Sequence, residues 1–172
     1  MKERAFTPRT IQPMKMLGLE AETKRFVFNH PFTSDMCYDR LISEAEKYNN
    51  NIIVGFDFDH TIFNHREYAD KLEDLDNAEE MSYQCIVDLL KGCKDVGMTL
   101  VLYTAEKSEE RLELKKEFCK RVGIKYDYVN ESPIMNGTNK PYFNILLDDR
   151  AGLQEAFNIL SKVVMKLSDQ TL

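Results

Sequence analysis

Two aspartates stand two positions apart in residues 56–61, whose sequence is FDFDHT, directly after a short apolar run. A carboxylate such as Asp57 can attack phosphorus and form an acyl phosphate, which splits one difficult displacement into two easier ones. Asp59, when protonated, can donate to the leaving oxygen and later accept a proton from the attacking water. The pair therefore predicts phosphoryl chemistry, with Asp57 as the nucleophile and Asp59 as the general acid and base.

Two carboxylates that face an anionic phosphate repel it, so this chemistry needs a cation. Asp148 and Asp149 can complete an all-oxygen site with Asp57. Oxygen ligands of this kind suit Mg²⁺, which also keeps water and phosphate oxygens in its shell. Thr104 and Lys140 can bind the remaining phosphoryl oxygens by hydroxyl donation and by charge. The residue types thus predict a magnesium-dependent site.

The elements that must position these residues alternate between strand and helix. Short apolar runs predict strands at 52–56, 99–103, 125–129 and 142–147. Helical spacing and capping residues predict helices at 34–48, from 76 or 77 to 97, at 108–121 and at 151–164. This alternation predicts an α/β fold, a three-layer Rossmann-like parallel sheet with helices on both faces. Ligands bind at the carboxyl ends of such strands, where the candidate residues fall.

The first 50 residues are expected to form an N-terminal arm and a helix that packs on a core of residues 51–172. Three prolines interrupt residues 1–35, and residues 24–29 can add an edge strand. Residues 1–30 carry six Lys or Arg and three Asp or Glu, within a chain of net charge -6. The acidic remainder argues against a broad nucleic-acid groove, because such grooves depend on Lys and Arg. The basic arm is interpreted as a solvated tail.

The composition indicates a globular chain, because 43% of its 172 residues are hydrophobic and 30% are charged. No apolar run approaches the length of a membrane span, and the first residues lead into no signal-peptide core. A cytoplasmic protein without a membrane partner is therefore expected. The four cysteines form no short Cys-x-x-Cys pair, which favours free thiols.

The ordered residues resemble the four motifs of the haloacid dehalogenase superfamily. The resemblance covers residues 52 to about 162 and rests on the FDFDHT segment, the strand that ends in Thr104, Lys140 with Pro141, and Asp148-Asp149. It implies an aspartyl-phosphate intermediate on Asp57. It also implies a magnesium site formed by Asp57, the backbone carbonyl of Asp59 and Asp148, with Asp149 in support. Thr104 and Lys140 would hold the phosphoryl group.

The short spacing from Lys140 to Asp148 is similar to a compact branch of that superfamily, which includes deoxyribonucleotidases and polynucleotide 3'-phosphatase domains. Residues 62–77 are too few for a full helical cap and residues 105–139 are taken up by a helix and a strand, which predicts a minimal cap and an open site. Another subunit of a homo-oligomer or the first 50 residues can cover it. His60 and Glu106 depart from the residue types frequent there, and Arg150 can pair with an acid. Nucleotides or polynucleotide ends are the expected substrates, with Tyr103, Tyr142 and Phe63 available for stacking on a base. Sugar phosphates remain an alternative, as does a phosphate-binding or interaction module with little turnover.

Overall fold

The computed structural model describes residues 32–134 and 141–171 of the chain. The arm and the edge strand expected at 24–29 lie outside the described residues, and so does Lys140. A compact unit begins at Phe32. None of the described helices combines the length and the apolar content that crossing a bilayer requires.

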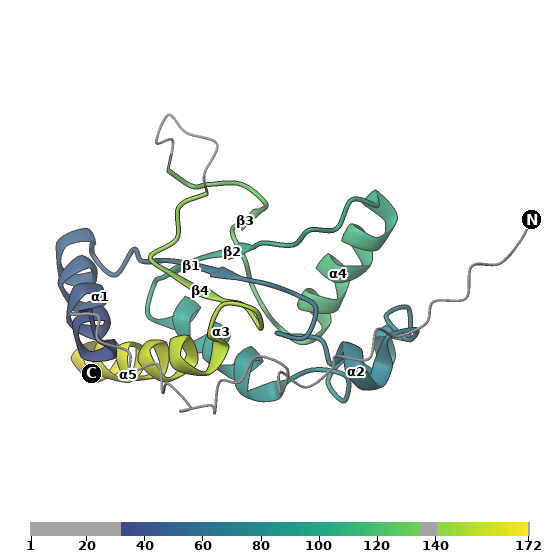
Figure 1. Cartoon of the computed structure of the whole chain (residues 1–172), viewed down its shortest axis with the longest axis horizontal. Coiled ribbons are helices and arrows are strands. Elements are labelled where there is room, and N and C mark those ends of the chain that lie inside the picture. Colours follow the sequence, from purple (N-terminus) through teal and green to yellow (C-terminus); the bar gives the residue numbers. More distant parts are fainter. Residues whose placement is uncertain (1–31, 135–140, 172) are drawn as a thin grey trace, which may run out of the picture. The chain divides into compact units, whose positions relative to one another are not determined.

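A four-stranded parallel sheet forms the centre of this unit (Figure 1). Its strands are β1 (Ile53–Phe56), β2 (Thr99–Leu102), β3 (Tyr128–Val129) and β4 (Ile145–Leu147). They lie in the order β3-β2-β1-β4, and β1 pairs with β2 on one side and with β4 on the other. The predicted α/β class with a parallel sheet is confirmed. The finer expectation of three layers with helices on both faces stays a prediction.

The two outer strands are shorter than predicted, because side chains replace backbone partners at their beginnings. The backbone N–H of Leu100 donates to Asp127 Oδ2 at 2.8 Å, so a carboxylate takes the place of a carbonyl before β3. The backbone N–H of Ile53 donates to Asn144 Oδ1 at 2.7 Å in the same way before β4. Side chains that bond to nearby backbone groups compete with regular ladders.

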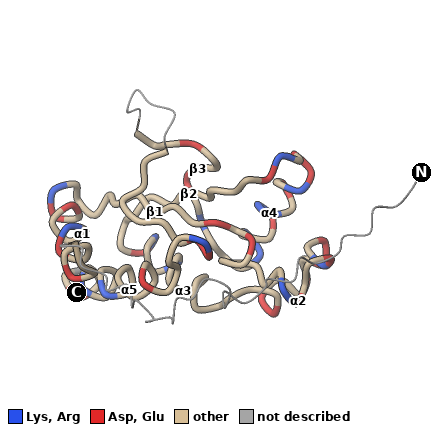
Figure 2. Tube along the Cα trace, viewed as in Figure 1, with Lys and Arg blue, Asp and Glu red and all other residues tan. Residues whose placement is uncertain are grey.

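The helices surround the sheet. They are α1 (Ser34–Tyr48), α2 (His65–Tyr68), the 3-10 turn η2 (Leu75–Asn77), α3 (Gln84–Asp95), α4 (Glu109–Arg121) and α5 (Leu153–Thr171). Thr33 and Ser108 cap α1 and α4 through their hydroxyls, close to the predicted boundaries. Figure 2 shows both signs of charge along α1 and α4.

The predicted start of α3 at residues 76 or 77 is wrong. Those residues end a separate 3-10 turn, and α3 begins only at Gln84. The intervening chain is held to the loop after β1, because the Tyr83 N–H donates to the Ile62 carbonyl at 2.8 Å and the Asn64 N–H to the Met81 carbonyl at 2.9 Å. The predicted end of the last helix near Val164 is also too early, since α5 continues to Thr171.

One face of the sheet shares a single apolar core with α1, α3, α4 and α5. The buried strand residues of that core are Val54, Phe56, Leu100, Leu102, Ile145 and Leu147. The opposite face of β1 carries Gly55, and a Cβ there would lie 2.8 Å from the ring of Phe143. Only glycine lets this ring lie so close to the strand. The chain is therefore tightly packed on both sides of β1, directly before Asp57.

Candidate active site

Asp57 follows β1 and is tied to the end of β4. Its backbone N–H donates to the carbonyl of Leu147 at 2.9 Å, which brings Asp57 beside Asp148 at the carboxyl ends of the two strands. Burial raises the pKa of Asp57 to about 6, and the charges of Asp148 and Asp59 add to this effect against an opposing hydrogen bond from the Phe58 backbone. The surroundings of Asp57 thus disfavour the negatively charged form of this carboxyl group.

A tight turn follows Asp57 and orients Asp59. The carbonyl of Phe58 accepts hydrogen bonds from the backbone N–H groups of Ile62 and Phe63, both at 3.0 Å. His60 adopts a left-handed backbone conformation with φ of 61°, and its N–H donates to the Phe63 carbonyl at 2.9 Å. The turn therefore closes on itself and fixes the direction of the Asp59 side chain.

Three buried aromatic rings connect this turn to α4. The ring of Phe58 lies 5.7 Å from that of Phe63, and both lie 5.4 Å from the ring of Phe118 on α4. All three residues are at most 1% exposed. Because the rings pack at fixed distances, one face of α4 is held against the turn that carries Asp59.

That face of α4 contributes a buried lysine that sequence reasoning missed. Lys115 is 2% exposed, and its Nζ donates to Asp59 Oδ2 at 2.7 Å and to Thr104 Oγ1 at 3.2 Å. The same nitrogen lies 3.7 Å from Glu106 Oε2 and 5.2 Å from the centre of the Phe58 ring. Burying a charge is costly unless partners compensate it. Here the partners are the predicted catalytic and phosphate-binding residues.

The sequence contained a signal for Lys115 that its charged surroundings concealed. Residues 113–117 read as a solvated run, Glu-Leu-Lys-Lys-Glu. Lys115 nevertheless shares helical spacing with the buried residues Phe118, Cys119 and Val122. A lysine on the apolar stripe of a helix indicates a buried charge, whereas Lys116 next to it lies outside that stripe.

Thr104 is brought to the site but lies behind Lys115. It is 6% exposed, its hydroxyl accepts from Lys115, and its backbone N–H donates to Asn130 Oδ1 at 2.8 Å. Asn130 follows β3 in a left-handed conformation with φ of 53°. Sequence reasoning did not identify Asn130, which positions the end of β2 from the neighbouring strand.

Glu106 organises the loop between β2 and α4. Its Oε1 accepts from the backbone N–H groups of Lys107 and Ser108, at 2.9 and 3.0 Å, and its Oε2 accepts from Arg111 Nε at 3.2 Å. The Ser108 hydrogen bond, with Lys107, Lys115 and Arg111 assisting, lowers the pKa of Glu106. This carboxylate therefore stays charged next to the other acidic groups.

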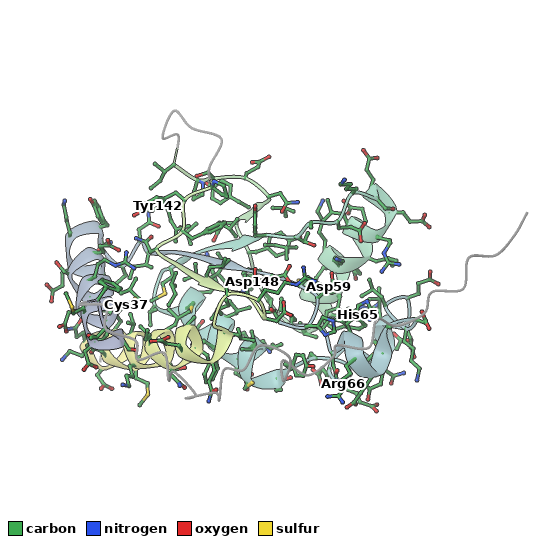
Figure 3. The ribbon with its side chains drawn as sticks, viewed as in Figure 1. Cys37, Asp59, His65, Arg66, Tyr142 and Asp148 are labelled. Atoms are coloured by element: carbon green, nitrogen blue, oxygen red, sulfur yellow. The ribbon has the colours of Figure 1, made fainter. Side chains whose placement is uncertain are left out.

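The predicted residues Asp57, Asp59, Asp148 and Asp149 share one pocket of about 320 Å³, which we call the carboxylate pocket. Figure 3 shows Asp59 and Asp148 near each other beyond the strands, with Tyr142 farther away. The lining residues are Asp57, Asp59, His60, Tyr103, Ala105, Glu106, Lys115, Asp148, Asp149 and Arg150. The Asp149 N–H donates to the buried Thr61 hydroxyl at 3.1 Å, and the Arg150 N–H donates to Asp148 Oδ1 at 2.8 Å.

The three aromatic residues expected near the substrate lie in different parts of the structure. Tyr103 lines the carboxylate pocket, whereas Tyr142 is not among its lining residues. Phe63 is 1% exposed and packs in the core, as is usual for an aromatic residue, so it is not available for stacking on a base. His60, Glu106 and Arg150 border the pocket.

The donor set fits a divalent cation of the magnesium type. Among the described residues no group of three or more His, Cys, Asp or Glu forms a metal-binding cluster. Mg²⁺ at phosphoryl-transfer sites is usually held by one or two carboxylates together with water and substrate phosphate. Asp57 and Asp148 provide such a pair. Burial raises the pKa of Asp57 and the charge of Asp148 adds to this effect, and a cation would offset both.

Comparisons of the chain with protein-family models, with curated proteins and with solved structures found no match. The function of the chain is therefore inferred from the residues of the carboxylate pocket.

Proposed function

We propose that this chain is a magnesium-dependent phosphomonoester hydrolase that acts through an aspartyl phosphate on Asp57, on a fold of the haloacid dehalogenase type. The observation that carries the proposal is the buried Lys115, which contacts Asp59 and Thr104 and lines the pocket that also holds Asp57 and Asp148. A buried cation beside a carboxylate pair suits the binding of a transferring phosphoryl group. In this proposal Lys115 performs the role that was expected of Lys140.

The first step forms the covalent intermediate. A carboxylate oxygen of Asp57 attacks phosphorus, the new O–P bond forms, and the P–O bond to the leaving alcohol breaks. Asp59 donates its proton to the leaving oxygen. Lys115, which the Thr104 hydroxyl holds in place, stabilises the charge on the equatorial phosphoryl oxygens. A bound Mg²⁺ would be held by Asp57 and Asp148, and would neutralise charge that the phosphoryl group shares with these carboxylates.

The second step regenerates the protein. Asp59, now ionised, accepts a proton from water, and the water oxygen attacks phosphorus. The bond between phosphorus and Asp57 breaks, so that inorganic phosphate and a free carboxylate result. Asp59 thus acts as an acid in the first step and as a base in the second.

The ion pair between Lys115 and Asp59 adds a condition to the first step. In the free site the Lys115 ammonium group holds the Asp59 carboxyl group at 2.7 Å. When a phosphoryl oxygen takes over the contact with Lys115, Asp59 is released from that ion pair. Substrate binding then leaves the Asp59 carboxyl group free to contact the leaving oxygen.

Nucleotides and polynucleotide ends remain the proposed substrate class, with sugar phosphates as the alternative. The test of the basic reaction is the release of phosphate from an aryl phosphate with and without Mg²⁺. We expect magnesium-dependent turnover that Asp57→Asn abolishes. Turnover that is equal in the Asp57→Asn variant would contradict the assigned mechanism, and binding of phosphate without turnover would favour the interaction module.

A further inference from the structure

A second pocket of about 340 Å³ lies next to the carboxylate pocket and differs from it in character. We call it the apolar pocket. It lies between the starts of α3 and α5, and its lining residues are His60, Thr61, Tyr83, Cys85, Ile86, Leu153, Gln154 and Phe157. None of these described lining residues is Asp, Glu, Lys or Arg. Its volume is at the lower end of the range of about 300–1,000 Å³ usual for ligand pockets, which suits one small group.

Two features join the pockets. His60 lines both of them. Thr61, in the wall of the apolar pocket, accepts a hydrogen bond at 3.1 Å from the N–H of Asp149, in the wall of the carboxylate pocket. A ligand with its phosphate beside Asp57 can therefore extend past His60 without leaving the protein surface.

The charges around the carboxylate pocket disfavour a second anionic group there. Glu106 remains ionised, because backbone N–H groups and Arg111 saturate its oxygens. Asp149 adds another carboxylate to the wall. The pocket wall carries five carboxyl groups, those of Asp57, Asp59, Glu106, Asp148 and Asp149, against the two cationic side chains of Lys115 and Arg150. A further phosphate, as in a polynucleotide or a diphosphate, would therefore meet an excess of negative charge, whereas an uncharged substituent would not.

We propose that the apolar pocket binds an aromatic substituent on the alcohol side of the substrate, so that the preferred substrates are phosphomonoesters with one phosphate and one aromatic group. Tyr83 and Phe157 provide rings for offset or edge-to-face packing, and Ile86 and Leu153 provide aliphatic contacts. This inference rests on the proposed function, and it selects an isolated aromatic monoester over a polynucleotide end.

The test compares 2-phenylethyl phosphate with ethyl phosphate on the full chain with Mg²⁺. Both are esters of primary alcohols, so their leaving groups are chemically similar and the ratio of their kcat/KM values reports the aromatic ring. We expect a ratio of about 10 to 100, as burial of an aromatic ring implies. A ratio near one would overturn the inference.

Two substitutions to tryptophan test whether the preference for the aromatic ester arises in the apolar pocket. Cys85 is exposed and lines the apolar pocket, so Cys85→Trp fills it and should reduce the ratio to within about twofold of one. Gln84, its exposed neighbour on α3, lines neither pocket, and Gln84→Trp should keep the wild-type ratio. An equal ratio of kcat/KM values in the two variants would show that the aromatic ring does not bind in the apolar pocket.

Binding of phosphonates separates this inference from the proposed function. Calorimetry with 2-phenylethylphosphonate and ethylphosphonate, which are not hydrolysed, should show the same 10- to 100-fold preference in the wild-type chain. If neither ester turned over while this preference persisted, the proposed function would fail and the apolar pocket would stand. If both esters turned over equally in an Asp57-dependent manner and both phosphonates bound equally, only the pocket assignment would fail.

Discussion

The turn after β1 and the face of α4 contribute to the same pocket in different ways. The turn carries its two aspartates within three residues and holds them by local hydrogen bonds and the bond to Leu147. The α4 face contributes Lys115, which lies 56 positions from Asp59 in sequence and reaches it only because Phe58, Phe63 and Phe118 pack together. The acidic half of the site is thus encoded locally, whereas the cationic half depends on tertiary packing.

The largest effect is expected from removal of the cationic half. Lys115→Met keeps most of the side-chain volume and removes the charge that binds Asp59 and Thr104. Asp59 is 37% exposed, so its carboxylate remains solvated and the fold should persist. We expect kcat/KM for an aryl phosphate to fall on the order of 1,000-fold. Steady-state kinetics, with circular dichroism as the check on folding, measure this effect.

Lys140→Met is the matched control for that variant, because sequence reasoning assigned the same role to Lys140. Because Lys115 performs that role in the proposed function, we expect a loss of less than about fivefold for Lys140→Met, the size usual for a single solvated charge. A large loss for Lys140→Met together with a small loss for Lys115→Met would reverse the comparison and reinstate the sequence-based assignment.

A substitution within β1 tests whether the acidic half depends on packing too. In Gly55→Ala the new Cβ would lie 2.8 Å from the ring of Phe143 and 2.9 Å from Leu146. We expect a loss of unfolding free energy of about 1–3 kcal/mol, the usual effect of overpacking, measurable by urea denaturation. Phe143→Leu in the same chain should recover part of the lost unfolding free energy. If that second substitution restored nothing, the Phe143 contact would not be the cause.

The charge on Asp57 should make a smaller contribution to stability, with a sign that depends on pH. Its pKa is about 6 in the folded chain and lower when unfolded, so folding favours the protonated form, and stability falls as the pH rises through about 6. Without Mg²⁺ at pH 7.5, Asp57→Asn should raise the melting temperature by about 2–4 °C, which corresponds to about 1 kcal/mol after solvent screening. At pH 4 the two proteins should melt alike.

Addition of Mg²⁺ should reverse that order at pH 7.5, because the cation stabilises only the chain that retains the carboxylate. Thermal unfolding of both proteins, once with Mg²⁺ and once with a chelator, measures the two melting temperatures directly. A wild-type melting temperature that does not respond to Mg²⁺ would argue against Asp57 and Asp148 as its ligands.

The smallest effect is expected at the edge of the cationic half. Glu106→Gln keeps hydrogen-bonding oxygen for the loop but removes the charge 3.7 Å from Lys115. We expect a change in kcat/KM of about two- to fivefold, in line with a single charge-assisted contact. Glu113→Gln, on the exposed side of α4, should change nothing by comparison.

The sequence predicted those parts of the molecule whose signals are local. The apolar run before Asp57, the cap at Ser108 and the alternation of strand and helix led to the parallel sheet and to the four aspartates that meet at its edge. Lys115 escaped notice because its partners are distant in the chain. The start of α3 was missed for a related reason, since bonds to Ile62 and Asn64 hold residues 81–83 outside the helix.

The central claim is an acyl phosphate on Asp57, and chemical trapping tests it most directly. The full chain is mixed with an aryl phosphate and Mg²⁺, quenched, and treated with borohydride, which reduces an acyl phosphate to an alcohol. Mass spectrometry of the digested chain should then show homoserine at position 57, only with substrate and Mg²⁺ present. Reduction at another carboxylate, or turnover without any reducible intermediate, would contradict the assignment.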